Sequence, residues 1–211
     1  MPRRNPIVLA SASPRRQELL KNAGIEFVVR PSDIPEIPLR GEDPRAFGVR
    51  MAREKARAVR SFAVGSPDDR RPFSACPERS EGADAGSLIL AADTVVAVDS
   101  EILGKPENTD DAKRMLRLLC NKTHEVITAV CLLGEEFEDV RSESTAVHFN
   151  SMTETEIADY VASGEPMDKA GAYAIQGLAS RWIANIEGDY YNVVGLPVDL
   201  VWRMLREHGA A

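Results

Sequence analysis

The chain has 211 residues, 44% of them hydrophobic, and a formal net charge of −7 at pH 7. This length and apolar content are sufficient for one sizeable buried core. The acidic balance argues against a general nucleic-acid binder, because that function needs a broad basic surface to neutralise phosphates. A small anionic ligand in a local basic pocket is still compatible with this composition.

The cysteines and histidines form no pattern typical of a metal site or a catalytic triad. Cys76, Cys120 and Cys131 include no CxxC pair and cannot all pair within one chain, which favours a reducing compartment. The three histidines lack ligand spacing. The apolar run at residues 7–10 is shorter than the roughly 7–15 residues of a signal-peptide core, and no apolar stretch approaches the roughly 18 residues of a membrane helix. We therefore expect a soluble, cytoplasmic protein with no membrane or nucleic-acid partner.

A strand-to-helix turn near the N-terminus has the features of an anion site. Residues 7–10 predict a short buried strand, and Ser13 as N-cap with Pro14 in the first turn predicts a helix. Arg15 and Arg16 then lie at the positive end of the helix dipole, where a cation is disfavoured by roughly 0.3–1 kcal/mol and a phosphate is favoured. Taken alone, the segment is equally compatible with two arginines that point into solvent.

The segments that follow alternate between strands and helices. Gly24 ends the first helix, and residues 27–29 predict a strand. Residues 31–38 contain several prolines and two carboxylates and predict an exposed loop. Asp43 caps a second helix with Pro44 in its first turn. The apolar face of that helix is formed by Phe47, Met51, Ala52 and Val59.

Residues 65–86 differ in character from the rest of the chain. They are charged and rich in Pro and Gly, without periodicity, and such composition does not order itself by burying apolar area. We expect a flexible loop inserted into a single domain over residues 1–211. A domain boundary is disfavoured, because the strand that follows carries chemistry that belongs with the N-terminal motif.

Asp93 and Thr94 interrupt an otherwise apolar strand over residues 88–98. An unpaired carboxylate in a core strand is too costly to persist, so Asp93 needs a partner. That partner is a cation, a metal-bound water or a reacting group; the structural alternative is a salt bridge with a lysine or arginine. We favour a functional carboxylate, because pKa tuning and metal binding occur where carboxylates lie in apolar settings.

Two lysines stand near these segments. Lys55 lies four residues after Met51, near the edge of the apolar helix face. Taken alone, its position is typical of a surface lysine whose methylenes cover apolar area while the ammonium reaches water. Lys105 is held in a tight loop at residues 104–106.

The C-terminal half continues the alternation. Asn108 or Thr109 caps a third helix. Residues 125–133 and 139–149 predict two antiparallel strands, and His148 is expected to be a cross-strand packing residue.

Later segments combine a structural helix with a stretch of small residues. Thr153 and Glu156 form a capping box for a helix that Gly164 ends. Residues 169–177 are rich in small residues, which permits close approach of a ligand or strand. Gln176 has the donor and acceptor groups suited to reading a base edge, and is otherwise a turn-stabilising amide. The last expected elements are a strand over 182–186, a loop over 188–192 and a helix that Pro197 opens.

Six motifs, taken in order, resemble those of one family. They are residues 9–20 (LASASPRRQELL), 52–56 (AREKA), 91–96 (AADTVV), 104–106 (GKP), 168–177 (DKAGAYAIQG) and 192–197 (NVVGLP). The chain resembles the Maf family of nucleoside triphosphate pyrophosphatases, also called septum formation inhibitor Maf proteins. The resemblance covers nearly the whole chain, and the main departure is the stretch over residues 65–86, which is longer than the family's usual connector. It implies an α/β fold in which a long mixed β-sheet is flanked by helices in two lobes with a central cleft.

Three positions separate branches within that family. The branch that acts on dTTP and UTP has the residue types found here at Arg15, Thr94 and Gln176. The branch that acts on 7-methyl-GTP has an aromatic residue at the first of these positions and a glutamate at the last. The resemblance therefore implies hydrolysis of dTTP and UTP to the monophosphate and pyrophosphate, with modified pyrimidine triphosphates as further candidates.

The resemblance also implies a set of site residues. The expected catalytic residues are Asp93, Lys55 and Lys105. The expected substrate-binding residues are Ser11, Arg15, Arg16, Thr94 and Gln176. Asp93 and Glu36 are expected to hold a divalent cation, Mg²⁺, through hard oxygen ligands. Sequence does not decide whether Asp93 acts as general base or as metal ligand.

Two alternatives stay open at this level. One is a nucleotide-binding regulator of septum formation without significant turnover, and the other is a 7-methyl-GTP pyrophosphatase. A homodimer is a candidate assembly of the chain.

Overall fold

The computed structural model describes residues 6–63 and 87–210. The loop expected over residues 65–86 lies outside these ranges. A mixed sheet of seven strands has the order β2-β1-β3-β5-β6-β7, and β4 pairs with β3 off this path. β1 is parallel to β2 and β3, whereas the other pairs are antiparallel. The strands are β1 (Ile7–Leu9), β2 (Phe27–Val29), β3 (Ile89–Val98), β4 (Glu101–Leu103), β5 (Thr123–Leu133), β6 (Glu138–Phe149) and β7 (Ile183–Glu187).

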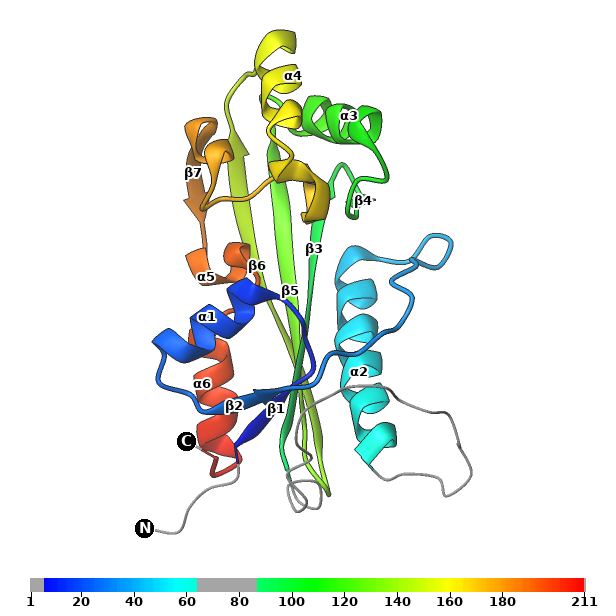
Figure 1. The fold of residues 1–211 in the computed structure, drawn as a ribbon, viewed down its shortest axis with the longest axis vertical. Coiled ribbons are helices and arrows are strands. Elements are labelled where there is room, and N and C mark those ends of the chain that lie inside the picture. The colour runs from blue at the N-terminus through cyan, green and yellow to red at the C-terminus, as the bar shows by residue number, and fades with distance from the viewer. Residues whose placement is uncertain (1–5, 64–86, 211) are drawn as a thin grey trace, which may run out of the picture.

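Helices gather at the two ends of the long strands β3, β5 and β6 (Figure 1). They are α1 (Pro14–Asn22), α2 (Pro44–Ala63), α3 (Thr109–Leu119), α4 (Glu154–Ala162), α5 (Tyr190–Val194) and α6 (Val198–Glu207), with short 3₁₀ helices η1 (Glu165–Asp168), η2 (Ala170–Ala172) and η3 (Leu178–Arg181). α1, α2 and α6 lie beside the lower part of the sheet, and α3 and α4 lie at its upper end. This arrangement confirms the predicted α/β fold with a long mixed sheet and two groups of helices.

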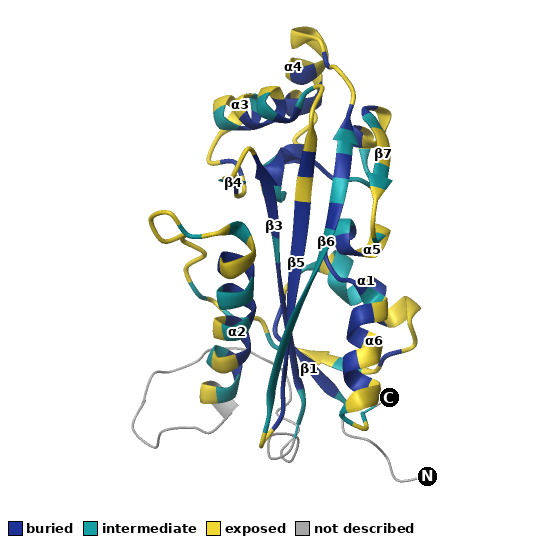
Figure 2. Ribbon diagram, turned by 180° about the vertical axis from the view of Figure 1, so that it is seen from behind, coloured by how far each residue is buried: buried dark blue, intermediate teal, exposed yellow. Residues whose placement is uncertain are grey.

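The central strand β3 is buried on both faces. Figure 2 shows buried residues concentrated on β3 and β5. Ala91 packs in the cluster of α2, and Ala92 packs in the cluster of α1 and α6. Burial on both sides explains the continuous apolar run in the sequence. Because strand side chains alternate, Asp93 faces the α2 side and Thr94 faces the opposite side.

One edge of β3 is open in the middle of the molecule. β1 pairs with β3 only at Ile89 and Leu90, and β4 pairs with residues 96–98. Within the described ranges, residues 91–95 therefore have no strand partner on this edge. Asp93 and Thr94 belong to this unpaired stretch, so both can reach the same space despite facing opposite sides of the sheet.

Several local signals in the sequence are confirmed by the backbone. Asp43 and Asn108 cap their helices through side-chain oxygens that accept backbone N–H groups, and the capping box of Thr153 is complete. Gly24 and Gly164 follow their helices with φ of +69° and +78°, a conformation that favours glycine.

The structure differs from the local expectations at four places. Ser13 occupies the N-cap position, but its side chain makes no capping bond; its backbone N–H instead donates to Ser11 Oγ at 3.2 Å. The loop expected over 188–192 contains the start of α5, which Asp189 caps through Tyr191 N at 2.8 Å. A five-residue helix is too short to show periodicity. β4 was not predicted as a strand, and β7 begins one residue later than expected.

His148 makes the cross-strand contact that its position predicts. It stands opposite Thr123 in the register of β5 and β6, and its Nδ1 lies 2.7 Å from Thr123 Oγ1. On the other side, Nε2 lies 3.2 Å from Glu187 of β7. The residue therefore joins three strands and lies outside the cavity described below.

His124 on β5 gives an expected pH dependence of stability. It is 3% exposed, its Nε2 lies 2.8 Å from Tyr173 Oη, and its Nδ1 has no hydrogen-bond partner among the residues that the structure describes. Burial lowers the pKa of His124 from 6.5 to about 4. Because the unfolded chain binds a proton that the folded chain excludes, stability present above pH 6.5 is lost as the pH falls towards 4, by up to about 3 kcal/mol.

Urea unfolding between pH 7 and pH 4.5 checks this expectation. The wild type should lose stability more steeply than His124→Asn, which has no imidazole to titrate. His148→Asn is the matched control and should keep the steep dependence. Parallel curves for the wild type and His124→Asn would contradict the assignment.

Candidate active site

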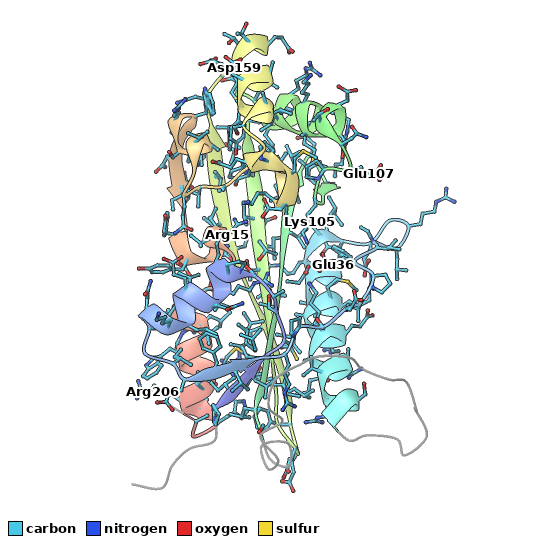
Figure 3. The ribbon with its side chains drawn as sticks, viewed as in Figure 1. Arg15, Glu36, Lys105, Glu107, Asp159 and Arg206 are labelled. Carbon is cyan, nitrogen blue, oxygen red and sulfur yellow. The ribbon has the colours of Figure 1, made fainter. Side chains whose placement is uncertain are left out.

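A cavity of about 620 Å³ lies at the open edge of β3, lined by residues of α1, α2, α5, η1, η2 and the loop after β4. Its volume is in the range of small-molecule sites. Eight of the predicted site residues line it: Ser11, Arg15, Arg16, Glu36, Lys55, Asp93, Thr94 and Lys105. Figure 3 shows Arg15 on α1, Glu36 in the loop before α2 and Lys105 after β4. The arginine pair and the strand aspartate therefore share one cavity, as the sequence predicts.

Lys55 stands between two carboxylates. Its Nζ lies 2.6 Å from Asp93 Oδ1 and 2.5 Å from Glu36 Oε1. Lys55 and Asp93 are 7% and 5% exposed. The interpretation of Lys55 as a surface lysine is therefore wrong, because the edge of the α2 apolar face turns into the cavity rather than into water. The free-energy cost of burying the ammonium is offset by its attraction to the two carboxylates.

The acid–base state of Glu36 follows from the same contact. Desolvation opposes its ionisation, but the attraction and hydrogen bond of Lys55, with Lys105 and Arg16 beyond, outweigh it and hold the pKa of Glu36 below its usual range. Glu36 is therefore an anion at neutral pH. The predicted exposed loop is confirmed, and it also delivers this carboxylate to the cavity.

The two carboxylates fit the demands of Mg²⁺. Asp93 and Glu36 each give one oxygen to Lys55, and their second oxygens make no hydrogen bond with the described residues. Within residues 6–63 and 87–210, no group of three or more His, Cys, Asp or Glu side chains could hold a metal ion. Mg²⁺ is often bound by one or two carboxylates together with substrate phosphates, so this pair suits a cation that arrives with a phosphorylated ligand.

Arg16 is anchored mainly by the protein. Nε donates to Gly195 O at 2.8 Å, Nη1 to Ala92 O at 2.8 Å and Ser11 Oγ at 3.2 Å, and Nη2 to Thr94 Oγ1 at 3.0 Å. A guanidinium has five N–H donors, so one remains for a ligand. Burial lowers the pKa of Arg16 against the opposing effect of Asp93 and Glu36. The solvent-facing alternative is wrong for this arginine, which joins α1 to β3 and to the turn after α5.

Arg15 and Lys105 are the available cations of the site. Neither forms a hydrogen bond or ion pair with any residue of the described ranges, and both line the cavity. Lys169 also lines it, paired with Asp168. Sequence reasoning missed Lys169 as a site residue, although a charged pair before a run of small residues was a usable signal.

Gln176 is not brought into the cavity. It is exposed and is absent from the cavity lining, which on this side of the molecule consists of Asp168, Lys169, Ala170 and Tyr173. Its role in reading a base stays a prediction.

Comparison with known proteins places the chain in a family. A family model described as Maf-like protein matches residues 6–208. The chain therefore belongs to the Maf family, which confirms the resemblance drawn from its motifs. Among the described helices, none combines the length and apolar character that crossing a bilayer requires.

Relatives with assigned activities are similar over nearly their whole length. The dTTP/UTP pyrophosphatase of Koribacter versatilis is 48% identical over 203 residues, which is 96% of this chain and 94% of the relative. That of Syntrophomonas wolfei is 47% identical over 204 residues, covering 95% and 96%. That of Geobacter metallireducens is 46% identical over 212 residues, covering 100% of both.

Proposed function

We propose that this protein hydrolyses dTTP and UTP to the nucleoside monophosphate and pyrophosphate in the cytoplasm. The observation that carries the proposal is the shared cavity of Asp93, paired with Lys55, and the uncommitted cations Arg15 and Lys105. The activity named for the relatives at 46–48% identity supports the substrate assignment. Free thiols at Cys120 and Cys131 suit a reducing compartment.

Asp93 is the proposed general base. Its second carboxylate oxygen accepts a proton from a water whose oxygen attacks the α-phosphorus. The bridging P–O bond between the α- and β-phosphates then breaks, and its electron pair leaves with pyrophosphate. Lys55 orients the carboxylate and balances its charge, because its ammonium lies 2.6 Å from the other oxygen.

The cations stabilise the charge that develops on the leaving group. Arg15 and Lys105 approach from α1 and from the loop after β4 (Figure 3), so phosphate oxygens can be held from both sides. Asp93 and Glu36 are the residues that would hold Mg²⁺, which when bound neutralises phosphate oxygens and lowers the pKa of a bound water.

A substrate panel tests the proposal. Pyrophosphate release is measured with dTTP, UTP, CTP and 7-methyl-GTP in the presence of Mg²⁺. Turnover of dTTP and UTP well above the other two is the expected result. Preference for 7-methyl-GTP would overturn the branch assignment. Binding of dTTP by calorimetry without release of pyrophosphate would favour the regulator of septum formation.

A further inference from the structure

A line of buried polar groups runs from the cavity into the sheet. Arg16 Nη2 donates to Thr94 Oγ1 at 3.0 Å, Thr94 Oγ1 lies 3.0 Å from Thr128 Oγ1, and Thr128 Oγ1 donates to Asn192 O at 3.0 Å. Thr128 and Asn192 are 0% exposed. Only Arg16 and Thr94 of this line reach the cavity.

The side chain of Asn192 is held in one orientation. Its Oδ1 accepts from Thr128 N at 3.0 Å, and its Nδ2 donates to Val126 O at 2.8 Å and to Thr145 Oγ1 at 2.9 Å. Turning the amide over would place its NH₂ against Thr128 N–H and its oxygen against Val126 C=O. Asn192 therefore fixes the end of the chain of hydrogen bonds and anchors α5 to the middle of β5.

The number of protons decides the direction of each bond. A threonine hydroxyl has one proton, and that of Thr128 goes to Asn192 O. The bond between the two hydroxyls must then be donated by Thr94 and accepted by Thr128. Gly195 O lies farther from Thr94 Oγ1, at 3.4 Å, and is the weaker acceptor, so the hydroxyl of Thr128 at 3.0 Å holds the proton of Thr94 inside the protein.

Thr94 therefore offers the cavity an acceptor and no donor. Its oxygen already accepts one bond from Arg16, and one lone pair remains. The space in front of it is kept open by Gly195, where an added Cβ would lie 3.6 Å from Thr94 Oγ1 and where φ is +126°. A ligand group that forms a hydrogen bond with Thr94 Oγ1 must be an N–H or O–H donor.

We propose that Thr128 and Asn192 are positioning residues that make Thr94 a hydrogen-bond acceptor and thereby select ligands that present a neutral donor. The inference rests on the proposed pyrophosphatase activity and deepens its specificity. In uracil and thymine, ring position N3 carries a proton, whereas N3 of cytosine is an acceptor. A sugar hydroxyl is the other source of the same donor chemistry.

Thr128→Val tests the proposal because it removes the hydroxyl with little change in shape. Asn192 O loses the hydrogen bond from Thr128 but keeps the one from Gly195 N at 3.1 Å, so it is still paired. The hydroxyl of Thr94 loses its acceptor and is freed to donate to a ligand. The ratio of kcat/KM for UTP to that for CTP should fall by about 10-fold or more. Thr128→Ser, which restores the hydroxyl, should restore the ratio.

Thr145→Val is the matched control for loss of a buried hydroxyl. Thr145 is also 0% exposed and bonds to Asn192, but it has no hydrogen bond with Thr94, so the ratio should stay at the wild-type value. Should Thr128→Val not fold, Thr128→Ala removes the same hydroxyl with less steric demand.

A second pair of substrates, dTTP and its 3′-deoxy analogue, shows whether the base or the sugar supplies the donor that contacts Thr94. A fall in the UTP/CTP ratio identifies the base as donor, and a fall in the dTTP/3′-deoxy ratio identifies the sugar. Unchanged ratios in a folded, active Thr128→Val variant overturn the proposal. Failure of the pyrophosphatase assignment is distinct, because the wild type itself would then release no pyrophosphate; in that case, unchanged relative affinities for the same four nucleotides by calorimetry would overturn the proposal.

Discussion

Asp93→Asn is expected to lower the rate of pyrophosphate release from dTTP by about 10³-fold while nucleotide binding is retained. The amide keeps the size of the side chain and a contact to Lys55, but it cannot take a proton from water. General bases contribute typically 10²–10⁴-fold, and in the absence of Mg²⁺ the loss of a carboxylate that faces phosphate does not weaken binding of an anion. Steady-state release of pyrophosphate with Mg²⁺ and calorimetric titration with dTTP without Mg²⁺ measure the two effects.

The control for this substitution is Asp139→Asn. Asp139 is also a carboxylate paired with a cation, Arg141 at 2.7 Å, but it lies on β6 outside the cavity lining. Its loss should leave turnover within about 2-fold of the wild type, since its pairs with Arg141 and His208 lie away from the cavity. Retention of more than a tenth of wild-type turnover by Asp93→Asn would argue that another group activates the water.

Local signals in the sequence were sufficient for most of the secondary structure. Asp43, Asn108 and Thr153 cap helices through bonds that span two or three residues, and such bonds depend only on neighbouring sequence. β3 could be predicted because burial on both faces leaves a continuous apolar run. α5 and β4 were missed because five and three residues are too few to establish a period.

The candidate site depended on contacts that no local pattern encodes. The pair of Lys55 and Asp93 joins residues 38 positions apart, and the bond of Arg16 to Gly195 joins residues 179 apart. Propensity arguments treated Lys55 as a surface residue and left Arg16 undecided. Their assignment to one site rested on the resemblance of the six motifs, taken in chain order, to those of the family. Thr128, an ordinary strand residue by pattern, had no signal of its own.

Lys55→Met is expected to destabilise the protein by about 3–5 kcal/mol at pH 7, because it leaves the buried carboxylate of Asp93 without its cation. The loss of the pair with Glu36 contributes less to this destabilisation, since the Glu36 side chain is 42% exposed and solvent screens its charge. Arg114→Met is the surface comparison. Arg114 is 48% exposed and its partners Glu101 and Asp111 are 49% and 19% exposed, so the loss should be below about 1 kcal/mol.

A double-mutant cycle separates the pair from the lost lysine packing. In Lys55→Met with Asp93→Asn, the buried charge is removed together with its partner, so most of the destabilisation seen in the single Lys55 variant should be recovered. Urea unfolding of the four proteins gives the coupling energy, and the single variant should also lose turnover. Additive losses, with no recovery in the double variant, would show that the ion pair does not hold the catalytic carboxylate in the folded protein. The charge on Asp93 would then have to be compensated by Arg16, which the cavity already places near it.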